Sequence, residues 1–286
     1  MPKKITNPVY KDLVNLKLIS DKNLIKINNT TRDKKINVLQ DIKSKIIFLE
    51  KFKSKKNYYQ NEKGATRSGL NSITKFVNGK KIKTAKVAYK NKKNLKNNIV
   101  GDDYRRFDQF KSLIKNKYIC DFGCGYGGFL TLAKNISKKL YGVELNNYFI
   151  NYLNSKKSYI ETSTDLENFN IKFDIITLFH VFEHLPNKIK TLKKIRENLK
   201  NKGKLILEVP HANDALIRLY KCEEFKKFTF WSQHLILHTS ESLRRFLKIC
   251  QFKNITIKGV QRYSLSNHLY WLKNNKPSGH SNEFSF

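Results

Sequence analysis

The chain has 286 residues, of which 40% are hydrophobic, and it carries 57 basic against 23 acidic residues. No apolar run approaches the roughly 20 residues that span a bilayer, and no apolar stretch follows the basic N-terminus, which argues against a membrane span and a signal peptide. The formal net charge of +34 admits an anionic partner such as nucleic acid, a membrane surface or a nucleotide-linked substrate. Because lysines occur in nearly every segment, we favour a solvated basic surface over a single binding stripe.

Cysteine usage indicates a reducing environment. The four cysteines stand at positions 120, 124, 222 and 250 and form no Cys-x-x-Cys pair. The first two flank the end of an expected strand and a glycine turn, which is a poor place for a metal cage. We therefore expect buried thiols, a cytoplasmic location and no bound metal.

The N-terminal third predicts a small β module followed by a linker. Residues 36–41 and 45–49 have the pattern of two strands joined by a tight turn, within a module placed at residues 1–60. Residues 61–101 contain glycines and many lysines, which is typical of a linker or a mobile lid. A helix is expected over 104–114, after two aspartates whose charges suit a helix N-terminus.

The most informative segment is Asp121-Phe-Gly-Cys-Gly-Tyr-Gly-Gly128. An apolar strand precedes it, a helix follows it, and a second strand at 139–143 ends in Glu144. Strand, glycine turn, helix, strand and acid make up the plan of a nucleoside-binding βαβ unit, in which the carboxylate accepts both ribose hydroxyls. The glycines allow a sharp turn and a close approach of the backbone to the ligand.

Two kinds of nucleoside ligand are open at this point. Gly123, Gly125 and Gly128 satisfy the dinucleotide pattern, which alone is weak evidence. Asp121 stands two residues before the first glycine, where its charge would repel a pyrophosphate and favour the ammonium group of an amino-acid tail. The segment therefore favours a nucleoside joined to an amino acid over a dinucleotide.

The rest of the chain alternates between expected strands and helices. Strands are expected near 158–160, 173–179 and 204–209, helices near 147–155, 188–199 and, after the capping residue Thr239, 241–250, and two closing strands at 252–260 and 265–272. This alternation predicts an α/β fold with a Rossmann-like, doubly wound, mostly parallel sheet of seven strands. Ligands of such sheets bind beyond the carboxyl ends of the strands, where the sequence places Gly123, Glu144, His180 and Pro210.

Together these segments resemble the class I S-adenosylmethionine-dependent methyltransferases over residues 102–262. Asp121-x-Gly-x-Gly-x-Gly127 is similar to their first motif, and Glu144 is similar to their ribose-binding acid. Phe173-Asp174 with Glu183-His184-Leu185 resembles the fourth-strand region of the small-molecule branch, and 201–210 resembles the fifth strand. The implied domain covers 102–273, with a substrate-side insertion at 210–239 and a tail at 274–286.

The resemblance implies S-adenosylmethionine as the cofactor and names the residues that hold it. These are Asp121, Gly123, Gly125, Gly127 and Glu144. Asp165 follows the third strand, where family members hold the adenine amino group, although it would equally cap a short helix at Leu166.

A second resemblance concerns the acceptor. Phe230-Trp-Ser-Gln-His-Leu-Ile-Leu-His-Thr239 is similar to the Glu-His-aromatic stretch of sugar C-methyltransferases, in which the histidine is the general base. This makes His234 the base candidate and His184 its partner. Gln233 stands where the family has glutamate, which disfavours deprotonation of a carbon acid and suits transfer to a hydroxyl. The family's zinc-binding N-terminal ribbon has a similar strand pair, but no cysteine precedes position 120 here, so packing would have to hold it.

The remaining candidates have structural alternatives. His180 ends the fourth strand and would face the methionine end of the cofactor, while His184 either points into the same cavity or packs in the core. Glu183 is expected to satisfy backbone amides in the first helical turn. Three aromatic residues would stack on a sugar or form a core cluster under a loop, namely Phe228, Phe230 and Trp231.

The sequence thus predicts an enzyme that transfers a methyl group to a small-molecule acceptor, with His184, His234 and His180 as catalytic residues. A sugar or nucleotide-linked sugar of surface polysaccharide synthesis is the favoured acceptor. An RNA methyltransferase is the alternative that the charge invites, but the chain has neither an Asn/Asp-Pro-Pro-aromatic motif nor a Pro-Cys nucleophile. A catalytically inactive nucleic-acid-binding protein of the same fold is a further alternative, against which the intact cofactor motif argues.

Overall fold

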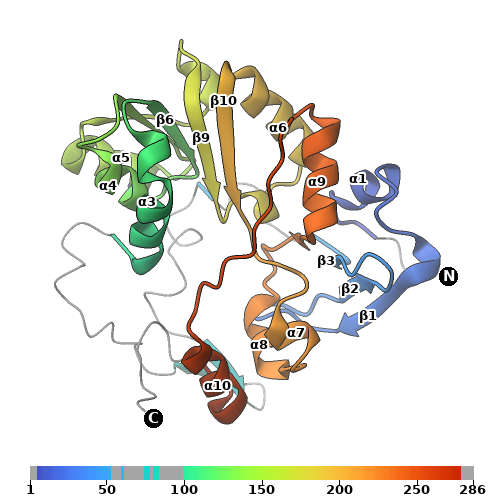
Figure 1. Cartoon of the computed structure of the whole chain (residues 1–286). Helices are drawn as coiled ribbons and strands as arrows, with labels where there is room; N and C mark the ends of the chain where they lie inside the picture. The colour runs from blue at the N-terminus through green and yellow to red at the C-terminus, as the bar shows by residue number, and fades with distance from the viewer. Residues whose placement is uncertain (1–4, 53–58, 61–73, 78–79, 84–98, 278–286) are drawn as a thin grey trace. The chain divides into compact units, whose positions relative to one another are not determined.

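The computed structural model describes residues 5–52, 59–60, 74–77, 80–83 and 99–277 (Figure 1). The predicted linker or lid at 61–101 lies mostly outside the described residues, which there comprise two short strands and residues 99–101. Most of the predicted tail at 274–286 also lies outside them.

The chain divides into two compact units, Met1–Ser54 with Ile176–Phe286 and Lys55–Ile175. The elements of the second unit are β4 (Thr74–Val77), β5 (Lys80–Lys83), α3 (Gly101–Ile114), β6 (Tyr118–Phe122), α4 (Gly128–Ala133), β7 (Lys139–Val143), α5 (Asn147–Lys156), β8 (Ile160–Ser163) and η3 (Leu166–Asn168). Strand β9 (Phe173–Phe179) begins in this unit and ends in the other.

The first unit takes its elements from both ends of the chain. From the N-terminal side come α1 (Tyr10–Asn15), η1 (Asp21–Asn23), β1 (Leu24–Asn28), β2 (Val38–Asp41) and β3 (Ile47–Leu49). From the C-terminal side come η4 (Phe182–His184), α6 (Lys188–Glu197), β10 (Leu199–Glu208), α7 (Ala215–Arg218), α8 (Glu223–Thr229), β11 (Ile236–Leu237), α9 (Ser240–Ile249) and α10 (Leu265–Asn274).

The alternating strands form a five-stranded parallel sheet of order β10-β9-β6-β7-β8 (Figure 1). Strand β7 pairs in parallel with β6 and with β8, which aligns Phe122 with Val143 and Val143 with Ser163. Because β6 and β7 end side by side, the glycine turn after β6 lies next to Glu144 after β7. This is the Rossmann-like α/β arrangement that the strand–helix alternation predicts.

The prediction of seven strands is wrong for the part of the chain that the structure describes. Residues 252–260 form no strand, and most of their side chains are exposed, so they lack the buried face that a strand needs. Residues 265–274 form helix α10, whose N-cap Ser264 accepts a hydrogen bond from Asn267 N at 3.3 Å. The buried residues Asn267 and Trp271 lie one helical turn apart, and this period outweighs the apparent alternation.

A separate antiparallel sheet of order β1-β2-β3-β11 contains the predicted N-terminal strand pair. Strands β2 and β3 face each other with Val38 opposite Leu49. Strand β3 also pairs with β11, which begins at Ile236, shortly after His234. The sheet shares one hydrophobic core with the C-terminal half of its unit, formed by Ile36, Val38, Ile47, Leu49, Ala212, Ile217, Phe230 and Leu237.

Two further properties concern the described residues alone. Within them, no helix has the length and apolar character needed to cross a bilayer. The four cysteines are free and buried.

Candidate functional site

The glycine-rich turn between β6 and α4 has three residues with left-handed backbone conformations. Gly123, Gly125 and Gly127 have φ angles of 79°, 52° and 65°. The turn is fixed to the end of β7, because Gly123 N and Cys124 N donate to Val143 O at 2.8 and 3.2 Å. The glycines that the sequence singled out therefore shape the turn itself.

Glu144 connects this turn to the end of β7. Its Oε2 accepts a hydrogen bond from Gly125 N at 2.9 Å, and its Oε1 accepts from Leu145 N at 2.7 Å and from Asn146 N at 3.0 Å. A carboxylate has about four lone-pair positions, so three backbone donors orient it and leave capacity for a ligand hydroxyl. A Cβ added to Gly125 would meet nothing within 4 Å, so space is open beside this carboxylate. Both features fit a nucleoside ribose at the turn.

The other predicted cofactor residues lie in the same unit. Asp121 is buried at the end of β6, directly before the turn. Asp165 caps η3, with its Oδ1 accepting from Glu167 N at 3.0 Å. The structure thus shows the capping role that the sequence offered for Asp165, and leaves its contact with adenine a prediction.

Lys157 is a structural residue of the turn that sequence reasoning missed. Its Nζ donates to Tyr126 O at 2.8 Å and to Thr131 Oγ1 at 2.7 Å, and so connects the turn with α4. Burial lowers the pKa of Lys157 to about 8, against the opposing effect of Asp103. No signal in the sequence separates this lysine from its many exposed neighbours.

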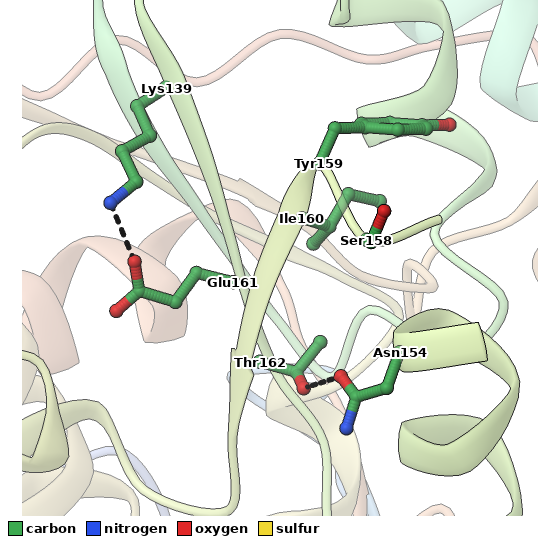
Figure 2. Close-up of a pocket in the computed structure, with 7 residues that line it drawn as sticks. All are labelled: Lys139, Asn154, Ser158, Tyr159, Ile160, Glu161 and Thr162. Carbon is green, nitrogen blue, oxygen red and sulfur yellow. Dashed lines mark hydrogen bonds and ion pairs between the residues drawn. The ribbon is translucent and has the colours of Figure 1, made fainter. Parts of the chain in front are cut away.

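A pocket of about 480 Å³ lies along the edge strand β8 (Figure 2). Its polar groups already satisfy each other, because Lys139 Nζ pairs with Glu161 Oε2 at 2.6 Å and Thr162 Oγ1 donates to Asn154 Oδ1 at 2.7 Å. The pocket contains none of the predicted site residues. We therefore do not assign it to the reaction.

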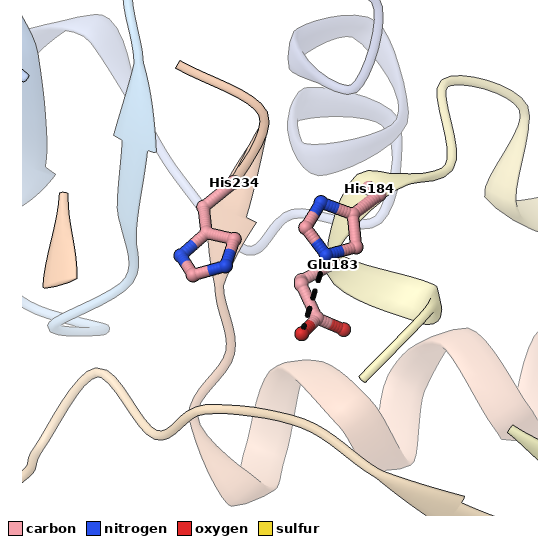
Figure 3. Close-up of side chains that lie close together, drawn as sticks. All are labelled: Glu183, His184 and His234. Atoms are coloured by element: carbon pink, nitrogen blue, oxygen red, sulfur yellow. Dashed lines mark ion pairs between the residues drawn. The ribbon is translucent and has the colours of Figure 1, made fainter. Parts of the chain in front are cut away.

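The other unit brings His184 and His234 together, with ring centroids 5.0 Å apart (Figure 3). His184 Nδ1 lies 2.8 Å from Gln233 O, and His234 Nδ1 lies 2.9 Å from Thr229 O. A carbonyl oxygen can only accept, so each Nδ1 carries a hydrogen and each Nε2 presents a lone pair. Burial lowers the pKa of both histidines, that of His234 to about 3.

Glu183 lies under this pair with its side chain fully buried, at 0% exposure. Its Oε1 is 3.3 Å from His180 Nδ1 and 3.8 Å from His184 Nε2, while its Oε2 has no hydrogen-bond partner within the described part of the chain. Burial alone would raise the pKa of Glu183, but the imidazoles, His184 first, hold that pKa at about 2. The expectation that Glu183 satisfies backbone amides is therefore wrong, because its partners are histidines.

His180 joins this carboxylate to a second one that the sequence did not single out. Its Nε2 lies 3.1 Å from Glu208 Oε1, at the end of β10. Burial opposes a charged ring, but the hydrogen bonds to Glu183 and Glu208 outweigh it and raise the pKa of His180. His180 also has a φ of 56°, a left-handed conformation that is costly for a residue with a side chain.

The predicted aromatic residues divide between the histidine pair and the core. Trp231 contacts both rings edge-on, with centroids 5.6 Å from His184 and 5.4 Å from His234, and Arg32 lies over its indole at 4.9 Å. Phe230 belongs to the core of the antiparallel sheet. Phe228 packs against Trp271 in a smaller cluster. Of the three, Trp231 alone lines the histidine pair.

Two charged residues fix the segments that carry the histidines, and sequence reasoning missed both. Lys188 is fully buried and donates from Nζ to Phe182 O and Leu185 O, and burial lowers its pKa to about 7. Asp33 accepts from Ser232 Oγ at 2.6 Å and from Ser232 N at 3.0 Å. An N-terminal residue thereby fixes the loop directly before His234.

Comparison with known proteins identifies the family of the chain. The family model described as a methyltransferase domain matches residues 99–257. The chain belongs to this family. It contains a class I methyltransferase domain whose cofactor is S-adenosylmethionine.

Individual relatives match only part of their length. A protein of Methanocaldococcus jannaschii without assigned function is 32% identical over 114 residues, which cover 40% of this chain and 49% of that protein. A tRNA U34 carboxymethyltransferase of Campylobacter fetus is 27% identical over 124 residues, which cover 38% and 44%. The chain spans about half the length of these curated relatives. A solved magnesium protoporphyrin IX methyltransferase from Synechocystis is 18% identical, with a TM-score of 0.43 over 55% of this chain and 74% of that one.

Proposed function

We propose that the domain at 102–273 transfers a methyl group from S-adenosylmethionine to a hydroxyl of a small molecule, a sugar or nucleotide-linked sugar being the favoured acceptor. The observation that carries this proposal is the pair His184 and His234, each fixed by Nδ1 with a lone pair on Nε2. Trp231 beside them offers an aromatic face of the kind that stacks on a sugar ring.

Each site residue has its own role in the proposed reaction. When bound, S-adenosylmethionine supplies an electrophilic methyl group and leaves as a neutral thioether. Asp121 pairs with the ammonium group of the cofactor and Glu144 accepts from its ribose hydroxyls. His234 accepts the proton of the acceptor hydroxyl on Nε2 as the oxygen–carbon bond forms, and His184 orients the acceptor. His180 lies beside Glu183 and supports its negative charge.

The residue beside His234 supports oxygen over carbon as the attacking atom. Gln233 is fully buried, and its Nε2 donates to Ser232 Oγ at 3.2 Å. A neutral amide does not strengthen the imidazole as a carboxylate would, so removal of a proton from carbon gains little help here. A hydroxyl requires a weaker base.

RNA is a second candidate acceptor, favoured by two specific observations. The chain has a formal net charge of +34, which promotes binding to phosphates. Some of its distant relatives are tRNA U34 carboxymethyltransferases. Binding that weakens steeply with salt would support this candidate over the small-molecule acceptor.

Calorimetric titration with S-adenosylmethionine and S-adenosylhomocysteine tests the cofactor site. We expect micromolar binding that is insensitive to salt and about 100-fold weaker in Glu144→Ala, because two charge-assisted hydrogen bonds of about 1.5 kcal/mol each are lost. Glu161→Ala, an exposed acid on the neighbouring strand, is the matched control and should bind normally. Absence of binding in the wild type would refute the enzyme proposal.

Transfer of labelled methyl groups then distinguishes the acceptors. Nucleotide sugars and total tRNA are offered separately to the wild type and to His234→Gln. Label in the sugar that is lost in His234→Gln supports the first proposal. Label in tRNA alone would replace it with the second.

A further inference from the structure

We propose that Glu183, His184 and His234 form a binding site for one divalent transition-metal ion of the zinc class. One ligand atom of each residue lies within 4.8 Å of the other two. Figure 3 shows the two rings and the carboxylate directed toward one another. All three residues belong to the same compact unit of the chain.

The hydrogen bonds of the two rings select the atoms that metals bind. His184 Nδ1–H donates to Gln233 O, and His234 Nδ1–H donates to Thr229 O. Histidines that ligate metals commonly donate their other ring N–H to a carbonyl or carboxylate in this way, which fixes the tautomer and the direction of the free lone pair. Both Nε2 atoms are therefore set for a Lewis acid before one arrives.

The carboxylate supplies an independent indication of a ligand. Glu183 is fully buried, and its Oε2 has no hydrogen-bond partner among the described residues. A buried carboxylate oxygen without a donor is costly. Its other oxygen lies 3.8 Å from His184 Nε2, close enough for one cation to bind both atoms after a small shift. An ion bound by this carboxylate would offset the cost of the missing donor.

The dimensions of the cluster suit zinc after small rotations. Zinc binds histidine nitrogen and carboxylate oxygen at about 2.0–2.2 Å, so ligand atoms of a tetrahedral shell lie about 3.4 Å apart. The separation of 3.8 Å between His184 Nε2 and Glu183 Oε1 is close to this value. The largest separation, up to 4.8 Å, closes with changes in side-chain torsions.

The donor set also restricts the kind of ion. Two imidazoles with one carboxylate suit zinc, cobalt or ferrous iron, whereas magnesium and calcium prefer oxygen ligands alone. Positive groups near the cluster are His180, which pairs with Glu183, Arg32, which lies over Trp231, and Lys188, whose Nζ donates to backbone carbonyls. Glu208 adds a second negative charge through His180. The single ligand carboxylate is therefore not the only acid that offsets the charge of the ion.

The catalytic role of the ion rests on the proposed function, whereas the test of ion binding does not. Three protein ligands leave a fourth position open, as in catalytic zinc sites. An acceptor hydroxyl bound there would lose its proton more readily, because the ion lowers the pKa of a bound oxygen. With the ion in place, the two histidines act as ligands, so the ion replaces the base role proposed above for His234, and the proton of the bound hydroxyl passes to solvent.

Metal titration of the chelator-treated full chain tests the site. Calorimetry with ZnCl₂ should show one ion per chain with a dissociation constant of about 1 µM or tighter. We expect Glu183→Gln and His234→Ala to weaken binding at least about tenfold. His211→Ala, which removes an exposed histidine outside the cluster, should leave it unchanged.

A visible spectrum of the cobalt-loaded wild type tests the site even if the variants do not fold. The wild type titrated with CoCl₂ should develop the intense visible bands of four-coordinate cobalt, which added zinc removes. Absence of these bands together with absence of zinc binding would overturn the proposal. Equal binding in Glu183→Gln, His234→Ala and the wild type would overturn it as well, since the ion would then be elsewhere.

Binding of S-adenosylmethionine, measured on the same metal-free sample, separates the two proposals. Cofactor binding without zinc binding refutes the metal site and leaves the methyltransferase proposal intact. Zinc binding without cofactor binding refutes the proposed function and leaves the metal site intact.

Discussion

The glycine-rich turn and the histidine cluster both form where strands end, but they depend on the chain in opposite ways. The turn occupies one continuous segment, 121–128, and backbone hydrogen bonds hold it to the end of β7 and to Glu144. The cluster combines residues 180–184 with 231–234, which strand β11, Asp33 and a shared core hold in place. A continuous site is therefore visible in the sequence, whereas a composite site depends on packing that the sequence does not display.

Phe230→Ala should produce the largest effect and separates the two regions. Phe230 is 2% exposed in the core of the antiparallel sheet and lies four residues before His234. Its loss should lower the free energy of unfolding by about 3–5 kcal/mol, measured by urea denaturation. Phe228→Ala, at a half-buried position, should cost less.

The cofactor affinity of the folded Phe230→Ala protein should match that of the wild type, because its core does not include the glycine turn. Calorimetry below the denaturation temperature measures this. A parallel loss of cofactor affinity would mean that the two regions are not independent.

Gly127→Ala and Gly125→Ala form a matched pair within the turn. Both positions have left-handed φ angles, so alanine costs about 1 kcal/mol at each. At Gly127 the new Cβ would also lie 2.9 Å from Leu153 Cδ2 and 3.1 Å from Ile160 Cδ1, which adds about 1–3 kcal/mol of overpacking. Thermal unfolding should therefore show the larger loss for Gly127→Ala.

For cofactor affinity, Gly125→Ala should have the larger effect and Gly127→Ala the smaller one. A Cβ at Gly125 enters open space beside Glu144, where we expect the nucleoside, so Gly125→Ala should weaken binding with little loss of stability. Normal affinity in Gly125→Ala would show that this open space is not where the cofactor binds.

Local patterns account for what the sequence predicted correctly. The βαβ order, the glycine turn, the position of Glu144 directly after β7 and the N-cap Thr239 of α9 each depend on residues near one another in the chain. The error at 265–274 has a local cause too, because the cap at Ser264 favours a helix over the strand that alternation suggested. The sequence predicts correctly whether a segment is a helix or a strand where one local signal dominates.

The rest of the site depends on contacts between distant segments. The pairing of His184 with His234 entered through a resemblance, but the carboxylate between them, Glu183, was assigned to backbone amides. No local pattern distinguishes a buried lysine such as Lys188 in a chain with so many exposed ones. The metal site proposed above departs from the expectation of no metal, which rested on cysteine spacing and did not weigh imidazole and carboxylate donors from separate segments.

Lys157 supplies the smallest effect, the contribution of the turn to the dependence of stability on pH. Burial lowers its pKa to about 8 in the folded protein, whereas an unfolded lysine titrates near 10.5. Below pH 8 both states are protonated and the folded state carries the full penalty of the buried charge. As the pH rises above 8 the folded state loses the proton first, so stability rises by up to about 1.4 kcal/mol per pH unit until the unfolded state also titrates. Urea unfolding between pH 8 and 9.5 should therefore show a smaller rise in Lys157→Met than in Lys156→Met, at the exposed neighbouring position, while buried Lys188, whose pKa is also lowered, contributes equally to both variants. Equal slopes in both variants would mean that the general charge of the chain, and not Lys157, sets the pH dependence.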